Sequence, residues 1–471
     1  MSKYFKCTTN KNPLTYSCGE KIIFTVTAKE NCLDIPCDFI HWKIAGDDGK
    51  FSEDLGSCKC GEPLILETTL DKPGFVHLTC TAFNQNAQPD NYFDVLDAGA
   101  GADIDAITYC DTIPDDFDDY WNDIEKLVAD FDYKVLLNKP ITDGVKEGFK
   151  AFDLRISTPE GRPASGIVTF PEKEGKYPIL MLFNGYGFSG AEVTCMPNTI
   201  TAHFNAHGFE NDLSNIMARK KYYHDIMKNK NGYGYGFDPE ENASNKTTYW
   251  RNMMIRNLLG VKYIKTLPCW DGKNIKVQGG SQGALQATTV AAHDNDVNFL
   301  EINVPWFCNL NGENKGYMAG WRPEFAEGLR YFDTVAEATR VKCPVKISAR
   351  LGDYICPPST IMTLYNSFNV NKQLVFIQSG THVYHPPETD AFYMWSEPEN
   401  PGGEIKIGKY RHYKGGEYEV LSLAKSSENY NDTVVVYKSL TDGKVWVRPA
   451  HMWDELVLHN GEYVKRFEIL K

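Results

Sequence analysis

The chain has 471 residues, a formal net charge of −13 and 13 cysteines. Its length predicts several domains, and its acidic balance argues against a nucleic-acid partner, since phosphate binding needs clustered lysines and arginines. No apolar run approaches the roughly 20 residues of a membrane span, and residues 1–7 lack the apolar core of a signal peptide. These features predict a cytoplasmic protein without a membrane partner, unless a leader has been removed.

The cysteines gather in the N-terminal part of the chain. In a protein without a leader, buried thiols are the favoured interpretation, and a disulfide is the alternative. Cys32 and Cys37, with Cys58 and Cys60, have the residue types of a zinc site. They lack paired C-x₂-C spacing, so no metal is predicted.

Short runs of alternating apolar and polar residues extend from about Tyr16 to Asn84, separated by turns rich in Asp, Gly and Asn. This pattern is typical of an immunoglobulin-like β-sandwich, which we expect over residues 1–90. The expected strands cover residues 21–28, 39–44, 64–70 and 74–82. Residues 85–106 are polar and rich in alanine and glycine, and this composition predicts a linker.

Residues 105–395 alternate between helical and strand patterns, which predicts an α/β domain with a doubly wound, mostly parallel sheet. Helices are expected over residues 114–128, where acidic residues crowd the first turn, and 248–267. The nearly all-apolar run Tyr177–Phe183 is typical of a buried parallel strand. Further strands are expected at 151–157, 164–170, from Ile275, at 299–304, 344–351 and 373–377.

The tail has a third pattern, with short β-like runs between glycine and asparagine turns. We expect a small β-barrel-like module over residues 405–471. Its expected strands cover residues 408–412, 417–423, 433–438, 445–449 and 463–470.

The segment 275–285 has the pattern of a strand, a glycine-rich turn with a serine, and a helix of small residues. Gly279, Ser281 and Gly283 match the G-x-S-x-G pattern of a nucleophile elbow. A β-carbon at the flanking positions would collide with the strand or the helix. Ser281 is therefore the candidate nucleophile. Taken alone, five such residues most often form an ordinary turn.

Two further polar residues follow the last two strands expected in this domain, namely Asp353 and His382. Ligands of an open α/β sheet bind beyond the carboxyl ends of its strands, and the order Ser, Asp, His is that of an α/β-hydrolase. A serine hydroxyl needs a base, and that base needs a carboxylate behind it. His382 is the predicted base and Asp353 the predicted orienting acid. His385 and Asp333 are the second choices for these roles.

A tetrahedral intermediate needs two backbone donors. One is the N–H of Gln282, directly after the nucleophile. The other is expected in the glycine-rich loop Asn184–Gly187, at Tyr186. His203 and His207 are out of order for the base and are candidates for lining the site. The sequence has no phosphate-binding loop, dinucleotide fingerprint or H-E-x-x-H motif, so neither a cofactor nor a catalytic metal is predicted.

At these residues the chain resembles the acetyl xylan esterases of carbohydrate esterase family seven, whose relatives include cephalosporin C deacetylases. The matching segments are Phe183–Gly187, Gly279–Gly283, Val304–Trp306, Gly352–Ser359 and Thr381–His382. The resemblance implies an α/β-hydrolase with Ser281 as nucleophile and Asp353 and His382 as its partners. It assigns the oxyanion hole to the amides of Tyr186 and Gln282, and it implies small acyl groups and a ring-shaped homo-oligomer.

The tail separately resembles a small bacterial domain of unknown function, through Gly408–Gly415, Tyr418–Leu421 and Trp446–Pro449. This second resemblance implies a fold unit without an assigned activity.

These observations predict a serine esterase that removes acetyl groups from xylan fragments or other acetylated sugars, with an acetylated oligosaccharide or a small ester as substrate. Two alternatives remain. One is a hydrolase for longer acyl esters or for peptides on the same fold. The other is a non-catalytic carbohydrate-binding protein, with two β modules beside a degenerate hydrolase.

Overall fold

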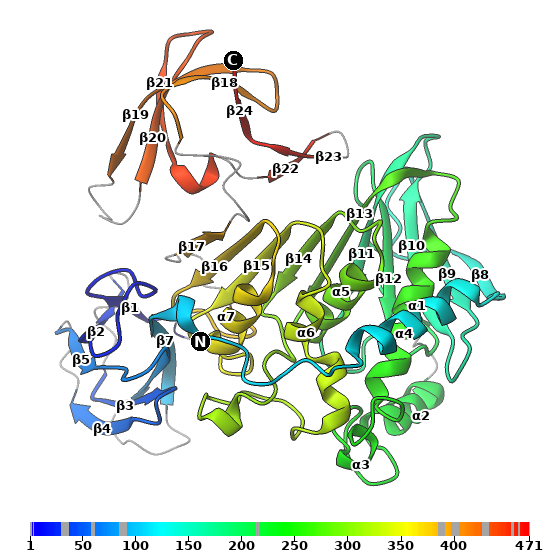
Figure 1. Ribbon diagram of the computed structural model, residues 1–471, viewed down its shortest axis with the longest axis horizontal. Coiled ribbons are helices and arrows are strands. Elements are labelled where there is room, and N and C mark those ends of the chain that lie inside the picture. The colour runs from blue at the N-terminus through cyan, green and yellow to red at the C-terminus, as the bar shows by residue number, and fades with distance from the viewer. Residues whose placement is uncertain are drawn as a thin grey trace. The chain divides into compact units, whose positions relative to one another are not determined.

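The computed structural model describes residues 2, 4–29, 37–57, 62–83, 92–212, 214, 216–384, 391–396, 405–425, 433–453, 456–459 and 462–470. The chain divides into two compact units, Met1–Met394 and Trp395–Lys471 (Figure 1). The first unit contains two N-terminal sheets and a large central sheet with its helices. In the part of the chain described here, no helix is long and apolar enough to cross a membrane.

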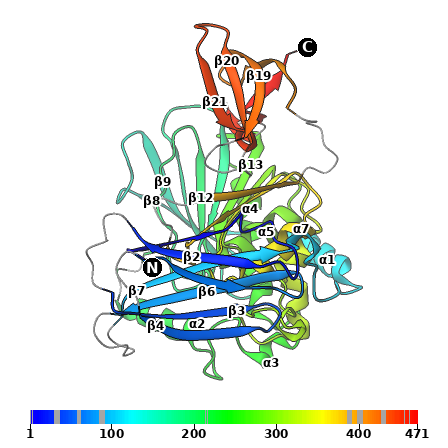
Figure 2. The ribbon, with the colours of Figure 1, turned by 90° about the vertical axis from the view of Figure 1, so that its left-hand side faces the viewer.

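Two antiparallel sheets form the N-terminal part (Figure 2), and they confirm the predicted sandwich. Phe24 and Leu66 from one sheet and Ile44 and Leu78 from the other belong to one buried apolar cluster. One sheet consists of β1 (Phe5–Thr9), β2 (Ile22–Ala28) and β5 (Leu64–Thr68), and the other of β4 (Phe51–Ser57), β3 (Phe39–Gly46), β6 (Gly74–Phe83) and β7 (Tyr92–Ala102).

Strand β7 shows that the linker predicted over residues 85–106 is wrong for Tyr92–Ala102. These residues pair in antiparallel register with β6, and Ala98 is fully buried. A β-carbon at Gly99 would lie 2.4 Å from the carbonyl oxygen of Leu351. Small residues are therefore required here by close packing against the central sheet, although their composition resembles that of a flexible segment.

A ten-stranded mixed sheet forms the centre of the first unit, in the order β17-β16-β15-β14-β13-β11-β12-β10-β9-β8. Neighbours from β12 to β16 run parallel, whereas β8, β9 and β10 pair antiparallel at one edge. This confirms the predicted α/β class and adds β8, β12 and β17, which were not predicted. The strands are β8 (Val135–Ile141), β9 (Phe149–Ile156), β10 (Ala164–Pro171), β11 (Tyr177–Phe183), β12 (Ile200–Asn205), β13 (Trp270–Gly280), β14 (Phe299–Asn303), β15 (Val345–Arg350), β16 (Lys372–Ile377) and β17 (Ala391–Ser396).

Helices pack against this sheet and against one another (Figure 1). The two predicted helices correspond to α1 (Phe117–Asp130) and α4 (Tyr249–Ile264). The other helices described in this unit are α2 (Ile216–Met227), α3 (Pro239–Asn242), α5 (Gln282–His293), α6 (Thr334–Ala338) and α7 (Pro358–Ser367), with short 3-10 turns η2 (Ile104–Ala106), η3 (Glu313–Lys315) and η4 (Glu327–Phe332). A further 3-10 turn, η5 (Ala450–Met452), belongs to the second unit.

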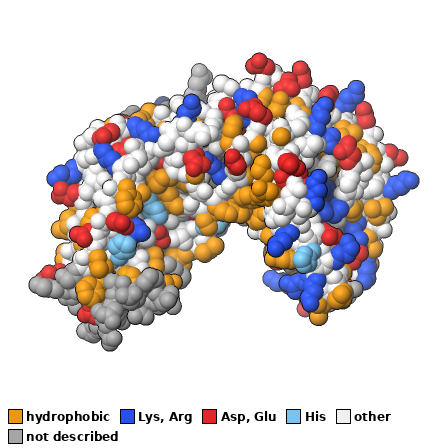
Figure 3. Space-filling view, turned by 90° about the horizontal axis from the view of Figure 1, so that it is seen from below, with side chains coloured by type: hydrophobic (Ala, Val, Ile, Leu, Met, Phe, Trp, Pro, Cys, Tyr) orange, Lys and Arg blue, Asp and Glu red, His pale blue; other side chains and the backbone are white. Residues whose placement is uncertain are grey.

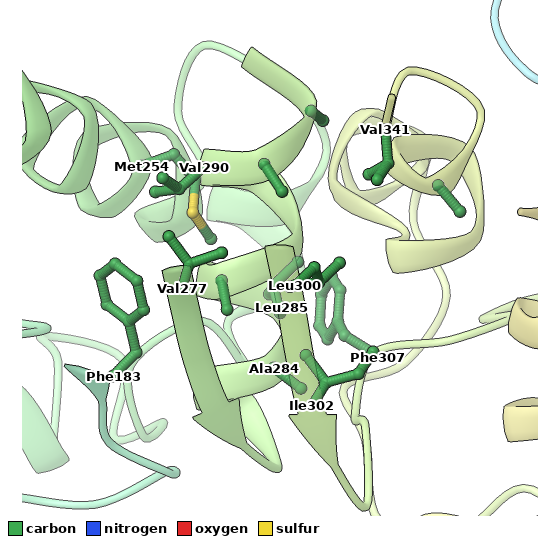
Figure 4. Packing of buried hydrophobic residues seen from close by; sticks show 14 of the residues in the cluster. Phe183, Met254, Val277, Ala284, Leu285, Val290, Leu300, Ile302, Phe307 and Val341 are labelled. Atoms are coloured by element: carbon green, nitrogen blue, oxygen red, sulfur yellow. The ribbon is translucent and has the colours of Figure 1, made fainter. Parts of the chain in front are cut away.

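The core beside the elbow strand fixes helix α5 on the sheet. Val277 from β13, Leu285 from α5 and Leu300 from β14 meet in one cluster (Figure 4) and are fully buried. Each such side chain stabilises the fold by about 1.5–3 kcal/mol. The end of β13 and the start of α5 are therefore tightly coupled, and the residue between them is Ser281.

The second unit is a small β module, and the first four predicted strands are confirmed. Trp453 stacks on Phe467 with ring centroids 3.9 Å apart, in a cluster with Tyr410 and Val420. One five-stranded sheet consists of β21 (Val445–Pro449), β20 (Thr433–Ser439), β19 (Glu417–Lys425), β18 (Gly408–His412) and β24 (Phe467–Ile469). A separate two-stranded hairpin consists of β22 (Leu456–His459) and β23 (Glu462–Lys465). The single strand predicted over residues 463–470 is wrong, because this stretch divides into β23 and β24, which belong to different sheets, and β22 was not predicted.

The surface and the cysteines are those of an ordinary globular protein. Acidic and basic side chains are interspersed on the face shown in Figure 3. The cysteines that the structure describes are free thiols. In the N-terminal group, Cys7, Cys37 and Cys80 are buried, as the favoured interpretation expects, whereas Cys18 is half-buried. Cys32, Cys58 and Cys60, considered for zinc, lie outside the described residues.

Candidate active site

The elbow has the geometry that its glycines predict. Ser281 has φ 54° and ψ −122°, a backbone conformation that residues other than glycine rarely adopt. Its N–H donates to the carbonyl of Asn303 at 2.9 Å. A β-carbon at Gly279 would lie 2.0 Å from the carbonyl oxygen of Gly283, and one at Gly283 would lie 2.2 Å from that of Phe183. The strand, the helix and β11 thus pass too close for any larger residue.

The structure brings the three predicted polar residues together in one hydrogen-bonded series. The imidazole Nδ1 of His382 is 2.9 Å from Asp353 Oδ2, and its Nε2 is 3.1 Å from Ser281 Oγ. An ionised carboxylate only accepts, so the imidazole proton belongs on Nδ1. Nε2 is then free to accept the proton of the serine hydroxyl.

Asp353 is fixed by its own loop. Its side chain is fully buried, and Oδ1 accepts from the N–H groups of Ile355 and Cys356, both at 3.0 Å. These bonds leave Oδ2 directed at His382. The turn that follows strand β15 therefore supplies the two N–H groups that orient the Asp353 carboxylate.

A metal is a poor fit for these groups. Ligand atoms of Asp353, Cys356 and His382 lie within 4.8 Å of one another, but burial holds the pKa of the Cys356 thiol well above its usual value. Since a thiol binds metal as the thiolate, this cysteine fits better as a neutral packing residue. Both nitrogens of His382 already have partners.

The predicted oxyanion loop lies beside the nucleophile. A β-carbon at Gly185 would be 3.7 Å from that of Ser281, which places Tyr186 next to the serine. Gln282 is the first residue of α5, where backbone N–H groups have no partner within the helix. The backbones of Tyr186 and Gln282 therefore both come close to the serine.

Tyr235, which the sequence analysis did not single out, joins these two donor segments. Its buried hydroxyl donates to Gln282 Oε1 at 2.7 Å and accepts from the N–H of Gly187 at 2.9 Å. Its ring stacks on Tyr186, with centroids 4.1 Å apart. One side chain thus ties the elbow to the loop that faces it.

His203 and His207 both brace this loop. His207 Nε2 donates to the carbonyl of Gly187 at 2.8 Å, and its Nδ1 accepts from the hydroxyl of Tyr249. Burial lowers the pKa of His207 to about 3, so the ring is neutral, as this bonding pattern requires. His203 Nε2 donates to Asn184 Oδ1 at 2.9 Å.

Asp333, the second choice for the acid, is bonded away from the serine. Asp333 is the N-cap of α6, and its carboxylate accepts from the N–H groups of Asn309, Leu310 and Val335. Burial raises its pKa to about 6. This is a structural role. His385 lies outside the described residues.

The N-terminal sheet braces the loops that carry the acid and the base. The His77 ring of β6 stacks on Tyr354, next to Asp353, with centroids 3.7 Å apart. The Gln378 amide, at the end of β16, donates to the carbonyl of Gly99 and accepts from its N–H. Both contacts join residues of the sandwich to segments of the site.

An aromatic surface adjoins the nucleophile. The N–H of Trp306 donates to the carbonyl of Ser281 at 3.3 Å. The Trp321 ring lies 5.3 Å from the Trp306 ring, 4.7 Å from Tyr186 and 4.8 Å from Phe237, between centroids. These rings form a compact apolar wall beside Ser281.

A separate polar pocket of about 530 Å³ opens on strands β13, β14 and β15, and neither Ser281 nor His382 is among its described lining residues. Its charged lining side chains are Glu192, Glu301, Lys346 and Arg350.

The fold and the hydrogen-bonded serine, histidine and aspartate define a serine hydrolase of the α/β-hydrolase class. The chain belongs to the acetyl xylan esterase family. The family described as "Acetyl xylan esterase (AXE1)" matches residues 104–313 and 322–398. A second family, described as a protein of unknown function (DUF1653), matches residues 408–469.

One curated relative and one solved structure are similar to this chain. The acetyl esterase Axe7A of Xylanibacter ruminicola is 25% identical over 342 residues, which cover 69% of this chain and 74% of that protein. The solved structure of acetyl xylan esterase 1 from Thermoanaerobacterium sp. is 19% identical with a TM-score of 0.50. The match covers 60% of this chain and 93% of the Thermoanaerobacterium chain, and it supports the α/β-hydrolase fold.

Proposed function

We propose that the chain is a serine esterase that removes acetyl groups from acetylated xylan fragments or similar acetylated sugars. The observation that carries this proposal is the hydrogen-bonded series from Ser281 through His382 to Asp353 at the elbow. Membership of the acetyl xylan esterase family and the name of the Xylanibacter relative support acetyl esters as the substrate class.

The mechanism follows from the geometry. Ser281 Oγ attacks the acetyl carbonyl carbon while His382 Nε2 takes the hydroxyl proton. Asp353 keeps the imidazole in the required tautomer and stabilises its positive charge. The N–H groups of Tyr186 and Gln282 stabilise the oxyanion. The sugar alkoxide leaves with the proton from His382, and a water molecule, activated by the same base, then releases acetate and restores the serine.

The aromatic wall supports a small acyl group. Trp306 is only 2% exposed and its N–H donates to the carbonyl of Ser281, so its position next to the elbow is fixed. A longer chain would have to displace packed rings. A series of p-nitrophenyl esters tests this point, since turnover that rises with acyl length contradicts an acetyl pocket.

The central test is Ser281→Ala. We expect acetate release from acetylated xylo-oligosaccharides to fall by at least about 10⁴-fold, because the nucleophile is lost. Ser244→Ala, the same change on a surface turn, serves as the matched control and should keep wild-type turnover. Wild-type turnover by the Ser281 variant would refute the mechanism. Failure of a fluorophosphonate probe to label Ser281 in the wild type would favour a non-catalytic carbohydrate-binding protein.

A further inference from the structure

A short loop, residues 313–321, coincides with the interruption in the family match between 313 and 322. It begins with η3 and ends on Trp321. The N–H of Trp321 donates to the carbonyl of Ile355 at 3.0 Å, and its carbonyl accepts from the indole N–H of Trp306. Ile355 is two residues from Asp353, and Trp306 is bonded to Ser281. Both backbone polar groups of Trp321 are therefore hydrogen-bonded to residues near Asp353 and Ser281.

The Trp321 side chain combines packing with exposure. Its ring meets Tyr186 edge to face, at 79°, and stacks near Trp306 at 26°. It is nevertheless 41% exposed, whereas Trp306 is 2% exposed. An indole that is fixed along one side and open on the other offers an apolar surface to a ligand. The faces of a pyranose ring, lined by C–H groups, suit such a surface.

The other end of the loop is bonded to the N-terminal sandwich. Lys72 Nζ donates to the carbonyls of Lys315 and Gly316, at 3.2 and 3.5 Å, and lies 4.5 Å from the centre of the Tyr317 ring. The N–H of Met318 donates to Asp47 Oδ1 at 2.8 Å.

Asp47 makes a rigid anchor for this loop. Its side chain is fully buried, and its second oxygen accepts from the N–H of Phe75 at 2.8 Å. The carboxylate thus joins the sandwich backbone at Phe75 to the loop backbone at Met318. The loop is fixed at Trp321 by the catalytic part and at its other end by the sandwich.

We propose that Trp321 is a specificity-determining residue that supports the sugar ring of the acetylated substrate, and that the N-terminal sandwich positions it through Lys72 and Asp47. This inference rests on the proposed function, because it concerns the leaving group of that same reaction. It gives the sandwich a defined part in substrate selection.

The test for Trp321 compares two esters, an acetylated xylo-oligosaccharide and ethyl acetate, which has no ring. For Trp321→Ala, we expect the ratio of kcat/KM on the sugar ester to kcat/KM on ethyl acetate to fall about tenfold, mainly through KM. Trp321→Phe, which keeps a ring, should retain most of the ratio. An unchanged ratio in the Ala variant, or an equal loss in the Phe variant, would overturn the inference. A wild type that hydrolyses neither ester would instead refute the proposed function itself.

The test for the sandwich is Lys72→Met, which keeps the aliphatic stem and removes the charged donor. We expect the same ratio to fall about three- to tenfold, and amide hydrogen exchange in residues 313–321 to accelerate. Lys72→Arg should restore both. Lys21→Met is the matched control, since Lys21 pairs with Glu67 on the sandwich surface, and it should leave both readouts at wild-type values. Equal effects in the two Met variants, or none in Lys72→Met, would exclude the positioning role.

Discussion

Replacing Tyr235 by phenylalanine removes one buried hydroxyl that bonds both donor segments of the proposed oxyanion hole. Two groups lose their partner, the half-buried N–H of Gly187 and the buried Oε1 of Gln282. A buried polar group left unpaired costs about 1–3 kcal/mol. The loss at Gln282 predicts a fall of about 1–3 kcal/mol in the free energy of unfolding. The half-buried N–H of Gly187 adds less, because water reaches it.

The same variant should lose activity. Gly187 directly follows Tyr186, so a loosened loop displaces the N–H that is proposed to stabilise the oxyanion. Complete removal of one such donor costs about 10²–10³-fold in kcat, and displacement should cost about 10–100-fold, with KM nearly unchanged. Urea unfolding gives the stability change. Initial rates of acetate release, measured well below the melting temperature of the variant, give kcat and KM.

Tyr365→Phe is the matched control. The Tyr365 ring is also buried, but its hydroxyl has no hydrogen-bond partner among the described residues. Its removal should therefore change neither stability nor kcat appreciably. If Tyr235→Phe is destabilised but keeps wild-type kcat, the hydroxyl is structural and the argument about the oxyanion loop is refuted.

Three further variants test other parts of the structure. Asp353→Asn should lower kcat about 10⁴-fold in steady-state assays, because an amide that donates to Nδ1 favours the wrong imidazole tautomer, and a loss below tenfold would contradict this role. Gly283→Ala should lower the free energy of unfolding by more than about 4 kcal/mol in urea titrations, since the new methyl meets the carbonyl of Phe183 at 2.2 Å. Gly56→Ala, with open space around it, is the neutral control. Burial lowers the pKa of His293, but the ion pairs with Glu337 and Glu125 outweigh burial and raise this pKa above its ordinary value of 6.5. The protonated His293 therefore stabilises the fold below about pH 6.5, and this stabilisation is lost as the pH rises through the pKa of His293 in the folded protein. His293→Gln should therefore flatten the decline of melting temperature with rising pH, and an unchanged slope would exclude this linkage.

The predictions that succeeded rest on local patterns. The elbow was predictable because Gly279 and Gly283 are required by contacts within a few residues of Ser281 or with an adjacent strand. The apolar run of β11 identified a buried parallel strand. The proximity of Ser281, Asp353 and His382 was predictable because each follows a strand of the same sheet, and the ends of parallel strands meet at one edge.

The features that were missed depend on contacts that are distant in sequence. β7 has the composition of a linker because Gly99 packs against the backbone at Leu351. Tyr235 lies 47 residues before Gln282 and is one tyrosine in a glycine-rich segment. No local pattern distinguishes a tyrosine that joins two loops from one that packs in a core.

The same reasoning explains why the sandwich resembles an independent module in the sequence yet belongs to the architecture of the site. His77 reaches the loop of the acid, Gly99 reaches the strand that leads to the base, and Asp47 reaches the loop that ends on Trp321. The contact between Gly99 and Gln378 spans 279 positions of the sequence, and the contact between Asp47 and Met318 spans 271. A triad works only when its members are held within about 0.5 Å of the productive geometry. Two of the three members here are on loops, so a second sheet packed against those loops supplies rigidity that the central sheet alone does not.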